Sequence, residues 1–176
     1  MGRPLIDTVE IPLSRPLRVL FVCLGNICRS PMAEAVFGHV AQEMGLLEQF
    51  RLDSAGTGGW HAGQPADPRT LAVLSEKGIT YGGRARQVVS ADFDRFDLFL
   101  AMDHTNLRDL QALAGRADGA DGAGRVHLMR HYDPQGAGAV PDPYYGSAGD
   151  LSGFRRVYEM LERSSRGWLE RIRGSG

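Results

Sequence analysis

The chain has little cysteine, no long apolar run and almost no net charge. Its 176 residues contain two cysteines, Cys23 and Cys28, which lie in one short segment. A disulfide framework and a cysteine-based zinc site are therefore excluded. No stretch is long and apolar enough to cross a membrane, and the first residues lack a signal-peptide core. A net charge of -1 and a pI near 6.5 provide no basic field for nucleic acid. We expect a cytoplasmic protein without nucleic-acid or membrane partners.

The histidines give no sign of a metal centre. They occur at positions whose spacing fits no common ligand set: His39, His61, His104, His127 and His131. The sequence therefore predicts no metal site and assigns these side chains no role.

Apolar runs that alternate with helical stripes indicate the fold class. Runs at 18–22 and 98–102 are typical of strands buried on both faces, and shorter candidates lie at 50–54 and 125–129. Helical periodicity is found at 31–44, 69–77, 104–114 and 151–172. This alternation predicts an α/β fold with three αβα layers and an open, doubly wound parallel sheet.

Residues 1–16 differ from the rest of the chain. They contain Pro4, Pro12 and Pro16 and show no sustained periodicity. We expect an extended N-terminal arm over 1–16, followed by a single domain over 17–173, a length typical of one domain.

The segment from Cys23 to Ser30 places a thiol and the Arg29 guanidinium six positions apart, between the first strand and the next helix. Phosphoryl transfer to sulfur requires a thiolate, which forms where loop N–H groups, a helix N-terminus or an arginine supply positive potential. The same groups bind a phosphate dianion. This layout favours a thiolate phosphatase, although the spacing alone also fits a buried cysteine beside a surface arginine.

The other residues of the segment fit a tight anion-binding loop. Gly25 allows unusual backbone conformations, and Asn26 tolerates the left-handed region. We expect Ser30 to cap the next helix and Pro31 to occupy its first position. In doubly wound sheets ligands bind at the carboxyl ends of strands, which is where this loop lies.

A phosphatase also needs a carboxyl group that protonates the departing oxygen. Asp142 is the candidate, because Pro141 and Pro143 stiffen its loop. An aspartate between prolines is by itself more often only a turn residue. Asp103 is better interpreted as the cap of the helix that follows it.

The segment from Val22 to Ala35, V-C-L-G-N-I-C-R-S-P-M-A-E-A, resembles the signature of the low-molecular-weight protein tyrosine phosphatases. Further matches follow in the family's order and span nearly the whole chain: Asp53 to Thr57, Ala85 to Gln87, Met102-Asp103 with Asn106 to Leu110, and Asp142 to Gly146. The resemblance implies four parallel strands in a flavodoxin-like arrangement. It also implies a hydrolase without cofactor or metal.

The resemblance assigns catalytic roles to three matching positions. Cys23 would form a phosphocysteine, Arg29 would bind the phosphoryl group, and Asp142 would act as acid and then as base. The remaining loop residues would bind substrate: Leu24, Gly25, Asn26, Ile27, Cys28 and Ser30. The implied substrates are a phosphotyrosine protein or a small aryl phosphate, and phosphate or sulfate-like anions would fit the loop. We expect a monomer.

Aromatic residues bear on substrate choice. Flat apolar walls favour a phosphotyrosine ring, and the resemblance implies that Trp60, Tyr144 and Tyr145 wall the entrance. Related arginine phosphatases carry threonine at the position of Ile27, so the isoleucine favours tyrosine.

Two positions concern the support of the loop. Cys28 is either a small packed residue or a partner that traps an oxidised Cys23 as a disulfide. Gly83 falls where the family often has a histidine that helps to fix the loop asparagine. We therefore expect Asn26 to depend on Ser30 and Ser54 for its hydrogen bonds.

Other function classes remain open. An arsenate reductase can share this loop, but the thioredoxin-coupled type needs further cysteines. A non-catalytic phosphotyrosine-binding module would tolerate loss of the nucleophile or the acid, and both are present. A small redox dithiol module is the weakest alternative.

Overall fold

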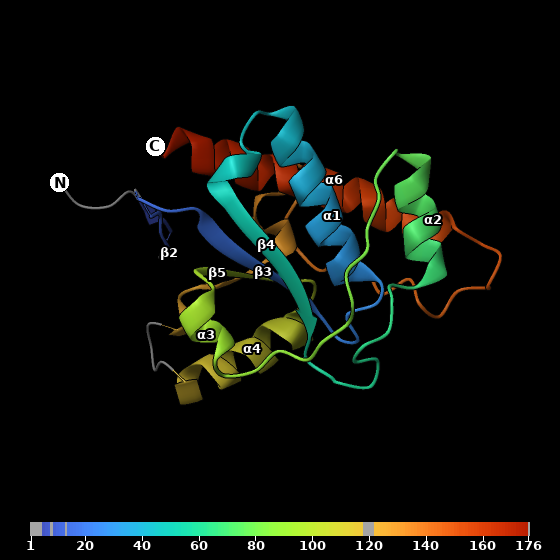
Figure 1. The fold of residues 1–176 in the computed structure, drawn as a ribbon, viewed down its shortest axis with the longest axis horizontal. Helices are drawn as coiled ribbons and strands as arrows, with labels where there is room; N and C mark the ends of the chain where they lie inside the picture. Colours follow the sequence, from blue (N-terminus) through green and yellow to red (C-terminus); the bar gives the residue numbers. More distant parts are fainter. Residues whose placement is uncertain (1–4, 8, 13, 118–121, 176) are drawn as a thin grey trace.

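The computed structural model describes residues 5–7, 9–12, 14–117 and 122–175. A parallel sheet lies between two layers of helices (Figure 1). Its strands, in the spatial order β4-β3-β5-β6, are β3 (Leu17–Cys23), β4 (Phe50–Gly56), β5 (Leu98–Ala101) and β6 (Val126–Leu128). The predicted three-layer, doubly wound α/β fold is confirmed.

The central strand β3 is buried on both faces, as its apolar run predicts. Because side chains alternate along a strand, Val19, Phe21 and Cys23 enter one core, and Leu20 and Val22 enter the other. Both neighbours of β3 pair with it in parallel. The strand therefore holds the sheet together and fixes the position of its own carboxyl end.

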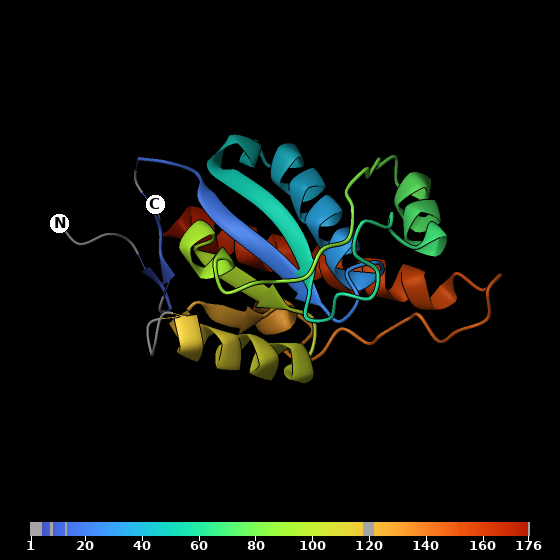
Figure 2. The ribbon, with the colours of Figure 1, turned by 60° about the horizontal axis from the view of Figure 1, so that its bottom comes forward.

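Helices cover both faces of the sheet (Figure 2). One face carries α1 (Arg29–Glu43) and the long α6 (Ser152–Gly174), with α2 (Pro68–Glu76) packed against them. The other face carries α3 (Asp92–Arg95) and α4 (His104–Ala117). The described residues also include two short 3-10 helices, η1 (Leu47–Gln49) and η2 (Met129–Tyr132). In the described part of the chain, no helix has both the length and the apolar character to cross a membrane.

The strand order creates a switch point beside β3. From β3 the chain moves to β4 on one side, and it later returns to β5 on the other side of β3. Crevices for ligands form at such reversals, at the carboxyl ends of the strands. The loop that follows Cys23 lies at this point.

The expectation of an extended arm over 1–16 is wrong for the residues that form a hairpin. Strands β1 (Leu5–Ile6) and β2 (Val9–Glu10) pair antiparallel. Ile6 and Val9 face each other in register, and both are buried in the main core. Two apolar side chains are enough to anchor such a hairpin but too few to give a periodic pattern. Residues 1–4, 8 and 13 of the predicted arm lie outside the described residues.

The end of the same segment is also tied to the sheet. Arg15 donates two hydrogen bonds of 2.7 Å to the carboxylate of Asp97, which precedes β5. Arg18 donates to the same carboxylate from its backbone N–H and its guanidinium. Burial alone would raise the pKa of Asp97, but these hydrogen bonds lower it to about 2. The segment before β3 is thus held by charge as well as by apolar contact.

Candidate active site

The chain curls around the sulfur of Cys23 between β3 and α1. Asn26 has a φ of 57°, the left-handed conformation that the sequence predicts for an asparagine here. Its backbone N–H lies 3.3 Å from Cys23 Sγ and donates to it. The Cys23 carbonyl accepts from the N–H of Thr57, just after β4, at 2.9 Å. The thiol is therefore enclosed by its own loop and by the end of the adjacent strand.

Ser30 does not cap the helix, so that prediction is wrong. Helix α1 begins at Arg29, two residues before Pro31, which the sequence placed at the first helical position, and Ser30 lies in its first turn. The Ser30 hydroxyl is 3.0 Å from Cys23 Sγ and accepts a hydrogen bond from Asn26 Nδ2. The Ser30 hydroxyl is thus bonded to the Cys23 sulfur and the Asn26 amide and not to a helix N–H group. Among the described residues, no side chain caps α1. The first N–H groups of the helix are left for an anion.

The side chain of Asn26 is held at both ends. Its Nδ2 donates to Ser30 Oγ at 2.8 Å and to Ser54 Oγ at 3.0 Å, which confirms the two predicted partners. Its Oδ1 accepts from the backbone N–H of Arg86 at 3.0 Å, a partner that the sequence did not indicate. All three contacts are made by a buried side chain, so they fix the centre of the loop.

Tyr81 occupies the space that a larger residue at position 83 would need. Its hydroxyl donates to Glu34 Oε2 at 2.8 Å and lies 3.3 Å from Ser54 Oγ, which also donates to Glu34. A Cβ atom on Gly83 would lie only 2.3 Å from this hydroxyl. Burial raises the pKa of Glu34, although the hydrogen bonds from Tyr81 and Ser54 oppose this shift. Tyr81 and Glu34 thus support Ser54, and through it Asn26, where the sequence left the loop's support in doubt.

The Arg29 guanidinium is buried beneath the loop and held by fixed partners. Its Nη1 donates to Asp103 Oδ2 at 2.7 Å and to the Val140 carbonyl at 3.1 Å. Its Nη2 lies 3.6 Å from Asp142 Oδ2. Burial opposes the charged form, but Cys23 and the two carboxylates raise the pKa of Arg29 above its ordinary value. The guanidinium therefore remains charged within the site.

Asp103 has two contacts, of which the sequence predicted one. Its Oδ1 accepts from the N–H of Asn106 at 2.8 Å, which confirms the capping role at the start of α4. Its Oδ2 binds Arg29. The second contact joins positions 74 residues apart in the chain, which no local pattern reveals.

A cavity of about 270 Å³ opens above the loop. The sequence-predicted residues that line it are Cys23, Leu24, Gly25, Ile27, Cys28, Arg29, Trp60, Asp142, Tyr144 and Tyr145. Asn26, Ser30 and Ser54 do not line it and act from behind the loop. His61 also lines the cavity, although the sequence assigned it no role. Its position directly after Trp60 in the chain could have indicated that it lies at the site.

The aromatic residues at the cavity mouth are unusually exposed. Trp60 is 71% and Tyr145 81% exposed, although large aromatic side chains are normally buried. The ring of Tyr144 meets that of Tyr145 edge-on, at 5.2 Å between centroids. Exposed rings around a hollow form a surface that another flat ring can contact.

Cys28 differs from Cys23 in its surroundings. Both thiols are free and buried. Burial, with the nearby Asp67 carboxylate, raises the pKa of Cys28 far above that of an ordinary thiol. Cys28 therefore carries a proton at neutral pH.

Comparison with known proteins identifies the chain at the level of the family. A family model described as "Low molecular weight phosphotyrosine protein phosphatase" matches residues 18–175. A low molecular weight protein-tyrosine-phosphatase of Streptomyces coelicolor is 49% identical over 159 residues, covering 89% of this chain and 93% of the relative. A human low molecular weight phosphotyrosine protein phosphatase is 42% identical over 153 residues, covering 87% and 94%.

A solved structure supports the same family. The protein tyrosine phosphatase of Entamoeba histolytica, crystallised with Hepes in the active site, superimposes with a TM-score of 0.82 at 38% identity. The match covers 90% of this chain and 97% of that one. The fold, with these relatives, makes the chain a protein phosphatase and hence a hydrolase. Within that class it belongs to the low molecular weight protein-tyrosine phosphatase family.

Proposed function

We propose that the chain hydrolyses phosphotyrosine monoesters through a phosphocysteine on Cys23. One observation carries this proposal: a thiol, a buried guanidinium and a carboxyl group, from Cys23, Arg29 and Asp142, line the same cavity at the uncapped start of α1. A phosphate group bound there would meet the helix N–H groups and Arg29 together. No metal is needed in this scheme, because these groups already balance the charge of the phosphoryl group.

In the first step the Cys23 thiolate attacks phosphorus while the bond to the tyrosyl oxygen breaks. The protonated Asp142 carboxyl donates its proton to that oxygen, so a neutral phenol leaves. The 3.6 Å between Asp142 Oδ2 and Arg29 Nη2 supports this role, because it places the acid next to the group that holds the phosphoryl oxygens.

In the second step water attacks the phosphocysteine. The Asp142 carboxylate, now deprotonated, accepts a proton from that water, the sulfur–phosphorus bond breaks, and inorganic phosphate leaves. The Ser30 hydroxyl, 3.0 Å from Cys23 Sγ, is placed to donate a hydrogen bond to the departing thiolate.

For the substrate we favour tyrosine over other phosphorylated residues. The exposed rings of Trp60, Tyr144 and Tyr145 line the same cavity as Cys23 and Arg29. Phosphoserine is too short to stack against such walls. An arginine phosphatase of Drosophila is also similar, at 30% identity and a TM-score of 0.79. Ile27, nearly buried at the base of the cavity, supports tyrosine because the arginine phosphatases resembling this family carry threonine there.

A turnover assay with phosphotyrosine, phosphoserine and phosphoarginine peptides of one sequence tests the substrate class. We expect the highest kcat/KM for phosphotyrosine. Preferential cleavage of phosphoarginine would refute the substrate assignment and favour the arginine phosphatase alternative. Absence of turnover on all three would favour a binding module.

Two variants test the mechanism. Cys23→Ser should abolish turnover while inorganic phosphate still binds, and retained turnover would contradict the phosphocysteine. Asp142→Ala should slow phosphotyrosine more than p-nitrophenyl phosphate, whose leaving group needs less protonation. Equal slowing of both esters would contradict a role as acid.

We also propose that Cys28 protects the nucleophile from oxidation. Hydrogen peroxide would convert the Cys23 thiolate to a sulfenic acid, with the peroxide reduced to water. The Cys28 thiol would then condense with it, releasing water and leaving a disulfide that thiols can reduce. The support is that both free thiols line one cavity.

A further inference from the structure

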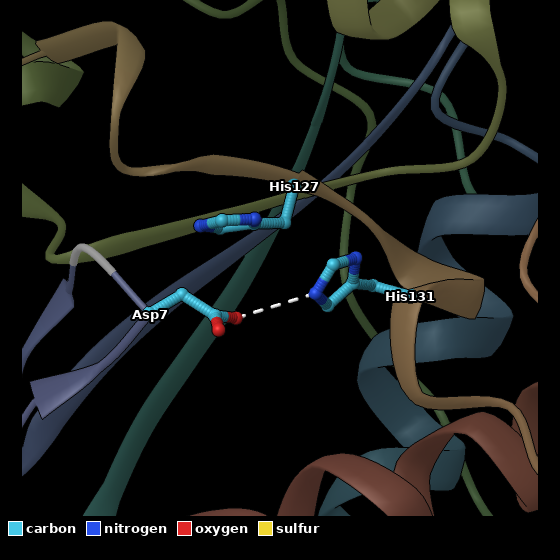
Figure 3. Close-up of side chains that lie close together, drawn as sticks. All are labelled: Asp7, His127 and His131. Atoms are coloured by element: carbon cyan, nitrogen blue, oxygen red, sulfur yellow. Dashed lines mark ion pairs between the residues drawn. The ribbon is translucent and has the colours of Figure 1, made fainter.

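Three side chains far from the phosphatase cavity converge at the N-terminal hairpin (Figure 3). Asp7 lies in the turn between β1 and β2, His127 lies on β6, and His131 lies in η2. One nitrogen or oxygen atom of each lies within 4.8 Å of the other two. His131 Nε2 and Asp7 Oδ2 are 3.2 Å apart. Two imidazoles and a carboxylate thus lie close enough together to share one ligand.

His127 presents a buried nitrogen with nothing to bind. Its Nε2 is shielded from solvent and has no hydrogen-bond partner among the described residues. The imidazole ring forms a hydrogen bond with the backbone of Gly124. Because Nε2 has no partner, we assign this hydrogen bond to Nδ1. An N–H at Nδ1 leaves Nε2 of the neutral ring with a free lone pair.

The other two groups are also held in place by outer contacts. Asp7 Oδ2 accepts a hydrogen bond from the Tyr132 hydroxyl. The buried Trp168 packs against both imidazoles, at 5.9 Å from His127 and 5.8 Å from His131 between ring centroids. In metal sites the ligands are oriented by such partners, which fix the tautomer of each histidine and the rotamer of each carboxylate.

We propose that Asp7, His127 and His131 form a binding site for a divalent transition-metal ion, with Zn²⁺ as the best-suited ion. Imidazole nitrogens with one carboxylate oxygen suit Zn²⁺, whereas Ca²⁺ and Mg²⁺ prefer oxygen ligands alone. Tetrahedral Zn²⁺ with bonds of about 2.0–2.2 Å holds its ligand atoms about 3.4 Å apart. The His131–Asp7 distance already fits, and the contraction of His127 toward the other two ligands, at most about 1.4 Å, is within the range of side-chain rotation. Water would fill the fourth position.

Such an ion would fasten the hairpin to the edge of the sheet. Asp7 is more than a hundred residues from its partners in the chain, so the ion would close a long loop. The hairpin lies beside the start of β3, whereas the Cys23 loop follows the opposite end of that strand (Figures 1 and 2). The site therefore acts on the stability of the hairpin and leaves the phosphatase chemistry to the cavity.

The test must separate this site from the thiols of the cavity, because thiolates also bind zinc. Zn²⁺ is titrated calorimetrically into the full chain carrying Cys23→Ser, in a buffer that does not chelate metals. We expect about one equivalent to bind. Asp7→Asn and His131→Gln, each added to that background, should weaken Zn²⁺ binding about ten-fold or more.

His104→Gln is the matched control, because it removes an exposed histidine elsewhere, at the start of α4. It should bind Zn²⁺ as tightly as the background chain. A second measurement is amide hydrogen exchange of residues 5–10, which Zn²⁺ should slow in the background chain but not in His131→Gln. Absence of Zn²⁺ binding, or equal affinity in His131→Gln and His104→Gln, would overturn the proposal. If His131→Gln does not fold, Asp7→Asn decides alone.

Discussion

The space that Gly83 leaves for the Tyr81 hydroxyl leads to a quantitative prediction about Tyr81. Tyr81→Phe removes one hydroxyl that donates to the half-buried carboxylate of Glu34 at 2.8 Å. Hydrogen bonds to charged groups contribute about 1.5–3 kcal/mol. Ser54 still donates to Glu34 at 2.9 Å, so we expect the free energy of unfolding to fall by about 1–2 kcal/mol.

The same change should reach the active site. Ser54 also accepts from Asn26 Nδ2, and without Tyr81 its hydroxyl has fewer fixed partners. If about 1 kcal/mol of the loss appears in the transition state, kcat on a phosphotyrosine peptide falls about five-fold. Urea unfolding and steady-state kinetics on the same preparation measure the two effects. Tyr158→Phe, on α6, is the matched control and should leave kcat unchanged.

Gly83→Ala provides an independent route to the same loss. The added Cβ would lie 2.3 Å from the Tyr81 hydroxyl, so the ring must move and its bond to Glu34 is lost. Gly83→Ala and Tyr81→Phe should therefore lose the same interaction. The loss of unfolding free energy in the double variant should be about 1 kcal/mol smaller than the sum of the losses in the two single variants. Strict additivity, or a Tyr81→Phe variant that behaves like Tyr158→Phe, would refute the role of Tyr81.

Three further predictions follow from single contacts. The pKa of Asp97 is lowered to about 2, so the ionised carboxylate stabilises the fold fully above pH about 4, and this contribution is lost as the pH falls through 2. Asp97→Asn should therefore lower the free energy of unfolding by about 2 kcal/mol at pH 7. In urea unfolding, the variant should show a weaker dependence of stability on pH between about pH 2 and pH 4 than the parent. Asp103→Asn keeps the helix cap through Oδ1 but presents an amide N–H to the buried Arg29 in place of the carboxylate, so kcat/KM should fall about ten-fold and the free energy of unfolding should fall as well; unchanged kcat/KM would contradict this. After peroxide and then thiol treatment, Cys28→Ser should recover less activity than the parent, and equal recovery would exclude a disulfide with Cys23.

Features encoded in short stretches of sequence were predictable. The strands appear as apolar runs because both faces of a parallel sheet are buried, and β3 shows this most clearly. The loop from Cys23 to Ser30 could be located because a strand end, a glycine and a helix start occur together. Even there the capping role of Ser30 was assigned wrongly, because its hydroxyl has a competing use beside the sulfur.

Contacts between distant segments were not predictable in the same way. Tyr81 meets Glu34 across 47 positions, and Tyr132 meets Asp7 across 125. Neither pair is joined by a periodic pattern, and their side chains are brought together only once the sheet and its crossovers have formed. His127 and His131 had no visible role for this reason, since their carboxylate partner lies in a hairpin that two apolar residues anchor.

Arg29 shows why the active-site loop depends on residues outside it. The guanidinium is buried, and an unpaired buried charge would be strongly unfavourable. Asp103 and the Val140 carbonyl both bind Nη1, whereas Nη2 lies 3.6 Å from Asp142 Oδ2 and the side chain lines the cavity. A lysine presents its three N–H donors from a single nitrogen, so it lacks the planar fork that can hold two phosphoryl oxygens side by side while other N–H groups bind Asp103. The requirement for arginine at this position therefore comes from Asp103, a residue on the far side of the sheet's switch point, as much as from the phosphate itself.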